Sequence, residues 1–215
     1  LFISLVTLTA INLFKPKSPE GLPLTAAVDR WKELSPMPVS SVGMASVAYN
    51  GEIYAIAGES QDGISGNVFR YTPETDSWVQ LSEKPTPVAG VQSVLIGEKI
   101  YVPGGRKDDG EITNILDIYN PRQDAWSTGA STPQPISDYA LAGFEGQLYL
   151  FGGWNGHQVL DVVYVYDPTT DAWSDATPMT TPRRSAGAVA LADKIIVAGG
   201  NNYEGALKEV TSYYP

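Results

Sequence analysis

Few side chains in this sequence are suited to catalysis. His157 is the only histidine, and there is no cysteine among the 215 residues. Without cysteine the chain has no thiol nucleophile, no disulfide and no thiolate metal ligand, and one histidine falls short of the several ligands of a zinc site. No G-x-S-x-G or comparable motif accompanies His157, so nothing supports a nucleophile–histidine–acid arrangement. We therefore expect neither a metal nor a cofactor.

Side chains suited to binding are more numerous. An arginine can hold a carboxylate through two parallel hydrogen bonds, and aromatic rings contribute strongly to protein interfaces. The candidates for contact with a ligand or partner are Arg106, Asp138, Trp154, His157, Arg183, Arg184 and Tyr203. Each also has a simpler explanation, because loop arginines are commonly solvated or paired with a nearby acid. Asp108 and Asp109 could pair with Arg106 in this way.

The acidic residues limit the class of partner. The formal net charge is −10, a field that repels phosphate backbones, so we expect no nucleic-acid partner. Carboxylates such as Glu59, Asp62, Asp108, Glu111 and Asp138 could perform acid–base chemistry only if the fold brought them together. We favour a non-catalytic function and keep an enzymatic one open.

The elements that position these residues follow an internal repeat. Trp31, Trp78, Trp126 and Trp173 are separated by 47, 48 and 47 residues. Two more markers keep this period: the second glycine of a Gly-Gly or Ala-Gly pair (Gly58, Gly105, Gly153, Gly200) and the tyrosine of a Tyr-x-Pro (Tyr71, Tyr119, Tyr166, Tyr213). Repeats of this length are typical of propellers and solenoids.

Each repeat predicts four short strands. A small-residue strand, a turn such as Asn50-Gly51, an apolar strand ending at the glycine pair, a third strand ending at the Tyr-x-Pro and a fourth strand beginning at the tryptophan follow one another. Short strands at even spacing with Gly and Pro turns indicate an all-β fold. A four-residue apolar strand cannot bury both faces of its sheet alone, so neighbouring sheets must stack.

The variable segments fall in two sets of loops. The loops between second and third strands and the loops between successive repeats emerge on the same face of a four-stranded meander, and they contain all seven candidate residues. Loops held by a repeated scaffold commonly carry function. We expect the binding surface on this face.

The glycine pair, tyrosine and tryptophan at this period resemble the kelch repeat, over about residues 26–215. The resemblance implies a β-propeller with three complete blades and one blade closed by N- and C-terminal strands, the first around Asp29–Leu34 and the second ending at Pro215. Because kelch propellers usually have six or seven blades, two interpretations stay open. Either the ring has four blades, or the chain is a fragment of a six-bladed propeller.

The resemblance also implies function. Kelch propellers are expected to bind other proteins, so the first hypothesis is a non-catalytic interaction module. The alternative is a glycan-binding or sugar-converting protein similar to the sialic acid epimerases, with arginines holding an acidic sugar. Copper oxidases of the kelch class use several histidines and a cysteine-linked tyrosine, which this sequence lacks.

The N-terminal segment differs from the repeats. Residues 1–14 carry no charge, and Lys15, Lys17 and a Pro-rich stretch follow, so residues 1–25 form a separate segment before the propeller of residues 26–215. Fourteen residues are fewer than the roughly 20 that span a bilayer, yet the pattern is that of the end of a transmembrane helix. A signal-peptide core and an extra strand are the alternatives. We favour membrane anchoring over a soluble protein, with the compartment undetermined.

Overall fold

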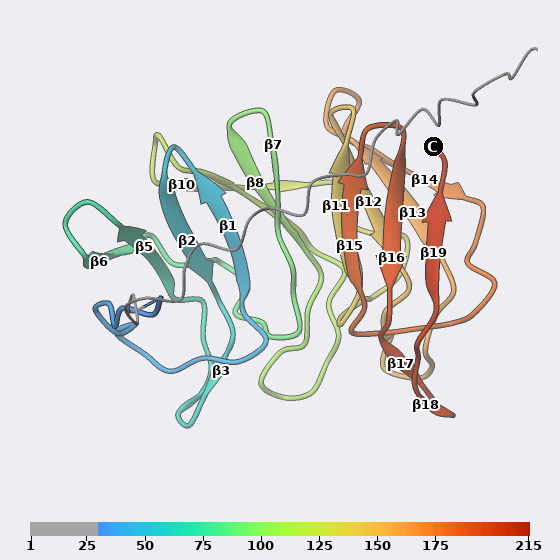
Figure 1. Cartoon of the computed structure of the whole chain (residues 1–215), viewed down its shortest axis with the longest axis horizontal. Helices are drawn as coiled ribbons and strands as arrows, with labels where there is room; N and C mark the ends of the chain where they lie inside the picture. Colours follow the sequence, from blue (N-terminus) through green and yellow to red (C-terminus); the bar gives the residue numbers. More distant parts are fainter. Residues whose placement is uncertain (1–29) are drawn as a thin grey trace, which may run out of the picture. The chain divides into compact units, whose positions relative to one another are not determined.

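The computed structural model describes residues 30–215, in which Ser35–Pro215 form one compact unit (Figure 1). This unit contains strands and no helix. Its main strands form four antiparallel sheets, one for each repeat. The predicted all-β propeller architecture is therefore confirmed.

Three sheets have four strands each. The first contains β1 (Ala45–Tyr49), β2 (Glu52–Ile56), β5 (Val68–Thr72) and β6 (Ser77–Leu81). The second contains β7 (Val94–Ile96), β8 (Lys99–Pro103), β9 (Leu116–Asn120) and β10 (Ala125–Gly129). The third contains β11 (Ala140–Phe144), β12 (Gln147–Phe151), β13 (Val163–Asp167) and β14 (Ala172–Ala176).

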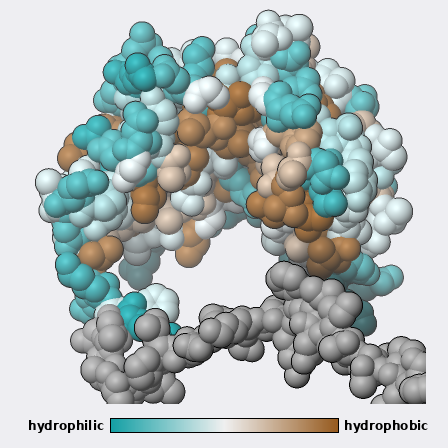
Figure 2. Space-filling view, turned by 45° about the horizontal axis from the view of Figure 1, so that its top comes forward, coloured by the Kyte–Doolittle hydropathy of each residue, from teal (hydrophilic) through white to brown (hydrophobic). Residues whose placement is uncertain are grey.

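The fourth sheet has three strands, β15 (Gly187–Leu191), β16 (Lys194–Ala198) and β19 (Val210–Tyr213). Two small hairpins lie in the loops, β3 (Glu59–Ser60) with β4 (Gly63–Ile64) and β17 (Asn201–Asn202) with β18 (Gly205–Ala206). Figure 2 shows apolar side chains gathered on the side of this unit that borders the open area of the view.

The core lies between consecutive sheets. Three clusters of buried side chains fill the interfaces between the first and second, second and third, and third and fourth sheets. Within each interface, one sheet contributes alternate strand residues such as Tyr54 and Ile56, and the next contributes residues such as Ile100 and Val102. This alternation follows from the two-residue period of a strand, and the second and third sheets thereby bury both faces against two neighbours.

The repeated tyrosine, tryptophan and an aspartate link each outer strand to the preceding repeat. In the third sheet, the Tyr166 hydroxyl donates to Asp171 Oδ1 at 2.7 Å, and the same oxygen accepts the Ala130 amide at 2.7 Å. Trp173 Nε1 donates to the Ala130 carbonyl at 2.8 Å. The same bonds join Tyr71, Asp76 and Trp78 to Ser35, and Tyr119, Asp124 and Trp126 to Ser82.

Backbone bonds link the sheets near the axis. Gly43, Gly90, Asp138 and Ser185 occupy equivalent positions with φ of 63°, 68°, 52° and 54°. The amide of each of the last three donates to the carbonyl of the one before, at 2.9, 2.7 and 2.6 Å. We call this set the axial ladder. The second glycine of each pair adds a bond, as when the Gly105 amide donates to the Ile136 carbonyl at 2.8 Å.

The predicted closing strand around Asp29–Leu34 is not observed. Residues 30–34 contain no strand, Trp31 is 93% exposed, and Asp29 lies outside the described residues. A strand forms only where its amide and carbonyl groups meet those of a neighbour. Tyr213 nevertheless takes the place of the other repeat tyrosines, with its ring 6.0 Å from that of Tyr149.

The N-terminal hypothesis concerns residues that the structure does not describe. Residues 1–14, in which we expect the end of a transmembrane helix, lie outside residues 30–215. Within residues 30–215 no helix has the length and apolar character needed to cross a bilayer.

Candidate functional site

The loop face is built by one backbone arrangement used four times. The residue after each glycine pair forms a bridge with a residue in the segment that enters the same sheet. These bridges join Val42 to Glu59, Ala89 to Arg106, Ser137 to Trp154 and Arg184 to Asn201. Because backbone atoms make the bridges, the side chains at these positions can vary while their places stay fixed.

Trp154, Arg184 and Asn201 are brought together where the third and fourth sheets adjoin. The Arg184 guanidinium carbon lies 5.3 Å from the centre of the Trp154 ring, a cation–π contact. Arg184 Nε donates to Asn201 Oδ1 at 3.1 Å. The indole and guanidinium are both partly exposed, so the pair presents an aromatic surface and a positive charge at one point.

Tyr203 and His157 lie on the loops beside this pair. The Tyr203 hydroxyl accepts the Val159 amide at 3.0 Å, and Val159 is itself bridged to Trp154. Tyr203 is 73% exposed, which leaves most of its ring free for contact. His157 is exposed, and its amide donates to Asn155 Oδ1 at 3.0 Å. We call Trp154, Arg184, Asn201 and Tyr203 the aromatic–arginine cluster.

Asp138 lies closer to the axis. It belongs to the axial ladder, and its carboxylate accepts the Ser137 hydroxyl at 3.1 Å. It lines a depression of about 250 Å³ whose other walls include Gly43, Gly90 and Ser185. The Asp138 side chain is partly exposed. A carboxylate at this place can bind a cation or accept a hydrogen bond from a donor.

Arg106 is separated from the cluster and is already paired. Its Nη2 lies 2.5 Å from Glu59 Oε2, with both side chains about two-fifths exposed at 39% and 40%. The pair links the loops of the first two sheets. The simpler explanation given above, pairing with a nearby acid, fits Arg106, although the acid is Glu59 rather than Asp108 or Asp109.

Arg183 is buried, unlike the arginine that follows it. It is 1% exposed, and its guanidinium donates to the carbonyls of Thr181, Gly199 and Glu209 at 3.4, 3.2 and 3.5 Å. The expectation that Arg183 contacts a partner from the loop face does not fit this placement. Adjacent residues of an extended segment point to opposite sides, so Arg184 faces outward and Arg183 inward.

Sequence reasoning missed a chain of amides beside the cluster. Asn155 Nδ2 donates to Gln134 Oε1 at 3.0 Å, and Gln134 Nε2 donates to the Tyr164 hydroxyl at 2.7 Å. The chain of bonds joins the loop that carries His157 to the segment between β10 and β11 and to β13 of its own sheet. Asn201 was missed too, although counting from the glycine pair gives it the same repeat position as Trp154.

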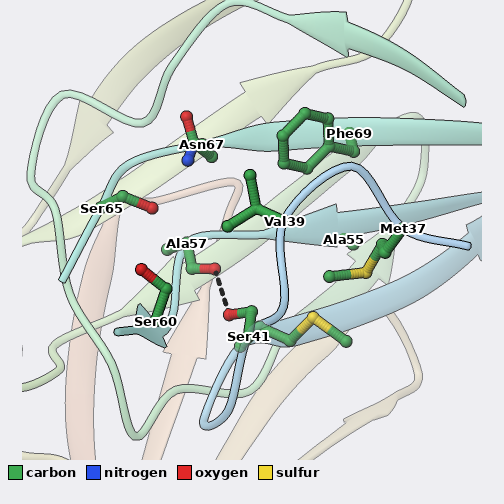
Figure 3. Close-up of a pocket in the computed structure, with 10 residues that line it drawn as sticks. Met37, Val39, Ser41, Ala55, Ala57, Ser60, Ser65, Asn67 and Phe69 are labelled. Carbon is green, nitrogen blue, oxygen red and sulfur yellow. Dashed lines mark hydrogen bonds between the residues drawn. The ribbon is translucent and has the colours of Figure 1, made fainter. Parts of the chain in front are cut away.

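A second pocket lies away from the loop cluster and is structural. Met37, Val39, Ala55 and Phe69 line it, and the Ser41 hydroxyl donates to the Ala57 carbonyl at 3.4 Å beside it (Figure 3). Its interior of about 10 Å³ holds no more than one water molecule. Among residues 30–215, no three His, Cys, Asp or Glu side chains form a group that could hold a metal ion.

Together these features define a repeat β-propeller that presents variable side chains on fixed backbone positions. A family model described as the KLHDC2/KLHL20/DRC7 kelch-repeats domain matches residues 31–215. The chain therefore belongs to the kelch-repeat family.

Two known proteins are similar to this chain, one in sequence and one in structure. The kelch repeat and BTB domain-containing protein 12 of Danio rerio is 27% identical over 133 residues, which are 60% of this chain and 15% of that protein. The chain thus spans a small part of its relative's length. The solved structure of YjhT superposes with a TM-score of 0.74 at 21% identity, covering 81% of this chain and 64% of that one. This likeness concerns the fold.

Proposed function

We propose that the chain is a non-catalytic binding module that contacts another protein through its loop face. The observation that carries the proposal is the aromatic–arginine cluster, in which Trp154, Arg184 and Tyr203 present accessible surface on backbone-fixed loops. Tryptophan, tyrosine and arginine are the residue types most enriched at interface hot spots. Membership of the kelch family supports the same class of function.

The chemistry of the cluster favours a partner segment that bears a carboxylate. Arg184 is the charged member, and within the described residues its side chain donates one hydrogen bond, from Nε to Asn201, so its terminal amino groups have no hydrogen-bond partner there. A guanidinium held over an indole is preorganised, so little side-chain entropy is lost when a carboxylate binds.

The test compares matched arginine variants against defined probes. Acidic peptides, the same peptides with every Asp and Glu changed to Asn and Gln, and basic peptides are titrated by fluorescence polarisation. We expect binding of acidic peptides that falls at least tenfold in Arg184→Glu and in Trp154→Ala. Arg122→Glu is the control, because Arg122 lies in the turn between β9 and β10 at the opposite end of its sheet. Equal binding by all variants would remove this site.

A second candidate ligand is an acidic glycan, because an indole beside a guanidinium also suits a sugar ring that carries a carboxylate. NMR titration with sialic acid and with a neutral hexose distinguishes this candidate. Shifts confined to the Trp154 and Arg184 signals with the acidic sugar alone would support it. Turnover of the sugar in the same sample would support the enzymatic alternative.

Membrane attachment through residues 1–14 is a separate proposal that rests on their apolar composition. Co-sedimentation with liposomes should be strong for the whole chain and absent after removal of residues 1–25. Equal sedimentation of both forms would contradict it.

A further inference from the structure

Asp138 and Arg184 carry opposite charges on adjoining repeats of the loop face, and neither forms an ion pair within residues 30–215. Arg106 differs from Arg184, because Glu59 pairs with it. Within the same residues, the Asp138 carboxylate accepts one neutral hydroxyl at 3.1 Å, and the Arg184 side chain donates to one neutral amide at 3.1 Å. Both groups therefore retain hydrogen-bonding capacity for a charged ligand.

The repeat shows that the fold does not need the charge of Asp138. The equivalent positions of the axial ladder hold Gly43, Gly90 and Ser185, which are all neutral. The ladder itself consists of backbone amides and carbonyls, so the carboxylate takes no part in it. The charge at this one position is thus available for binding.

The charge of Arg184 is equally dispensable for the backbone. Its equivalents in the bridges beside the glycine pairs are Val42, Ala89 and Ser137, none of which is charged. Arg184 makes the same backbone bridge as these residues, and its side chain adds only contacts on the loop face.

The two charged residues are neighbours through the backbone but are held apart. The Ser185 amide donates to the Asp138 carbonyl at 2.6 Å, and Arg184 directly precedes Ser185. The guanidinium is drawn to Trp154, with 5.3 Å between its carbon and the ring centre, while the carboxylate is tied to the Ser137 hydroxyl. Each charge therefore remains available to a partner.

Asp138 also borders the depression of about 250 Å³ near the axis. Two other polar side chains of this depression are engaged internally. Gln92 bonds through both of its amide atoms to backbone groups of the third and fourth repeats, at 3.0 and 3.3 Å, and the Tyr139 hydroxyl donates to a carbonyl of β8. The Asp138 carboxylate and the exposed Ser185 hydroxyl are left to receive a ligand.

We propose that the loop face recognises a partner segment that carries a basic and an acidic side chain close together. This inference rests on the proposed function and adds a second contact to it. Arg184 binds the carboxylate, and Asp138 binds the ammonium or guanidinium group in the axial depression. A purely acidic segment makes the first contact but meets like charge at Asp138, so the aspartate supplies specificity.

The test uses four peptides of equal length with acetylated and amidated ends, which remove the terminal charges. At two fixed positions they carry Lys and Glu, Gln and Glu, Lys and Gln, or Gln and Gln, and the set is repeated with different numbers of glycines between the two. NMR titration gives the Kd of each. At the best spacing, changing Gln to Lys beside the Glu should lower the Kd at least fivefold in the parent chain. The gain should be less than twofold in Asp138→Asn and in Asp138→Ser.

The variants and their control are matched to the structure. Asparagine tolerates the left-handed backbone of Asp138, and serine already occupies this ladder position in the fourth repeat. The control is Asp175→Asn, an exposed aspartate of β14, which removes the same charge from a chain of net charge −10. It measures the general attraction of a cation and should keep the fivefold gain.

The outcomes separate this inference from the proposed function. A lysine gain that persists in both Asp138 variants, or one that is lost equally in Asp175→Asn, would overturn the inference. If the Gln and Glu peptide binds through Arg184 and lysine adds nothing, the proposed function stands and the inference fails. If no peptide binds, both fail. Should both Asp138 variants unfold, the Asp138 amide signal of the parent chain decides, because it should shift with the Lys and Glu peptide and not with the Gln and Glu peptide.

Discussion

A lysine and an aspartate are buried against each other between the first and second sheets. Lys84 Nζ lies 2.7 Å from Asp117 Oδ2, with side-chain exposures of 0% and 1%, and also donates to the Thr86 carbonyl at 2.8 Å. Burial lowers the pKa of Lys84, and the attraction of Asp117 opposes this shift without cancelling it. At the equivalent interface of the third and fourth sheets, Met179 and Thr211 line one pocket instead.

The repeat supplies a double-mutant test of this ion pair. Removing one partner alone, as in Lys84→Met or Asp117→Thr, leaves an uncompensated buried charge and should lower the free energy of unfolding by about 3–5 kcal/mol. The double variant copies the Met179–Thr211 pairing and should recover most of the loss, since buried pairs are often replaceable by packed neutral residues. Urea unfolding measures all four proteins. Additive losses in the double variant would contradict the argument.

Titration of Asp171 should account for part of the loss of folding stability at acid pH. The Ala130 amide and the Tyr166 hydroxyl bind its carboxylate and lower its pKa in the folded protein. The stabilisation is complete above the unfolded pKa of about 3.9 and is lost as the pH falls through the lower folded value. In Asp171→Asn, the amide oxygen can still accept both bonds but does not titrate. The loss of stability between pH 5 and pH 3 should therefore be smaller in this variant than in the parent chain.

Arg183 and Arg184 show which properties of a single residue could be predicted from the sequence. Their positions in a loop segment suggested that both could bind, but the repeat holds Ser41, Val88 and Ile136 at the place of Arg183. Val88 and Ile136 are both fully buried, so the repeat alignment contained the signal that Arg183 is internal. The cation–π contact of Arg184 had no such signal, because it depends on the distance between two sheets.

At the scale of the element, the glycine pair can be tested with a matched control. Gly104 and Gly97 both have φ of 61°, but a Cβ on Gly104 would lie 2.1 Å from the Ile136 carbonyl oxygen, whereas one on Gly97 meets nothing within 4 Å. Gly97→Ala should therefore report only the backbone cost of about 1 kcal/mol. Gly104→Ala should cost at least twice as much in chemical denaturation. Equal costs would show that the contact between sheets relaxes freely.

Strands were more predictable than the structure within loops. The internal repeat with its Gly and Pro turns predicted four short strands in each repeat, and the main sheets contain the first three of them in every repeat and the fourth in three repeats. The hairpins β3–β4 and β17–β18 were not predicted. Each strand in them has two residues, too few for a period, and backbone bonds to the entering segments hold them.

At the scale of the whole molecule, stability should fall from the third sheet to the fourth. The third sheet is covered on both faces and has four strands, whereas the fourth has three and an exposed face. Repeat proteins open locally where neighbours are fewest. Hydrogen exchange should therefore be at least tenfold faster for the amides of β16 than for those of β12. Equal protection would indicate that the unit opens only as a whole.

The sequence predicted the repeat array well and its closure poorly. The period fixes which residues are equivalent, and therefore the number of sheets and the face that carries the loops. Closure depends on the angle between successive sheets, which many small packing contacts determine together. The segment containing Trp31 has the right spacing for an outer strand, yet it contains no strand in the structure.

The axial ladder has a consequence for how this protein can change over time. Gly43, Gly90, Asp138 and Ser185 are joined through amides and carbonyls, so the bonds of the ladder use no side chain. Mutations that alter the recognition surface can therefore accumulate without loosening the frame. New specificity can evolve on such a protein one loop at a time, while each intermediate remains folded.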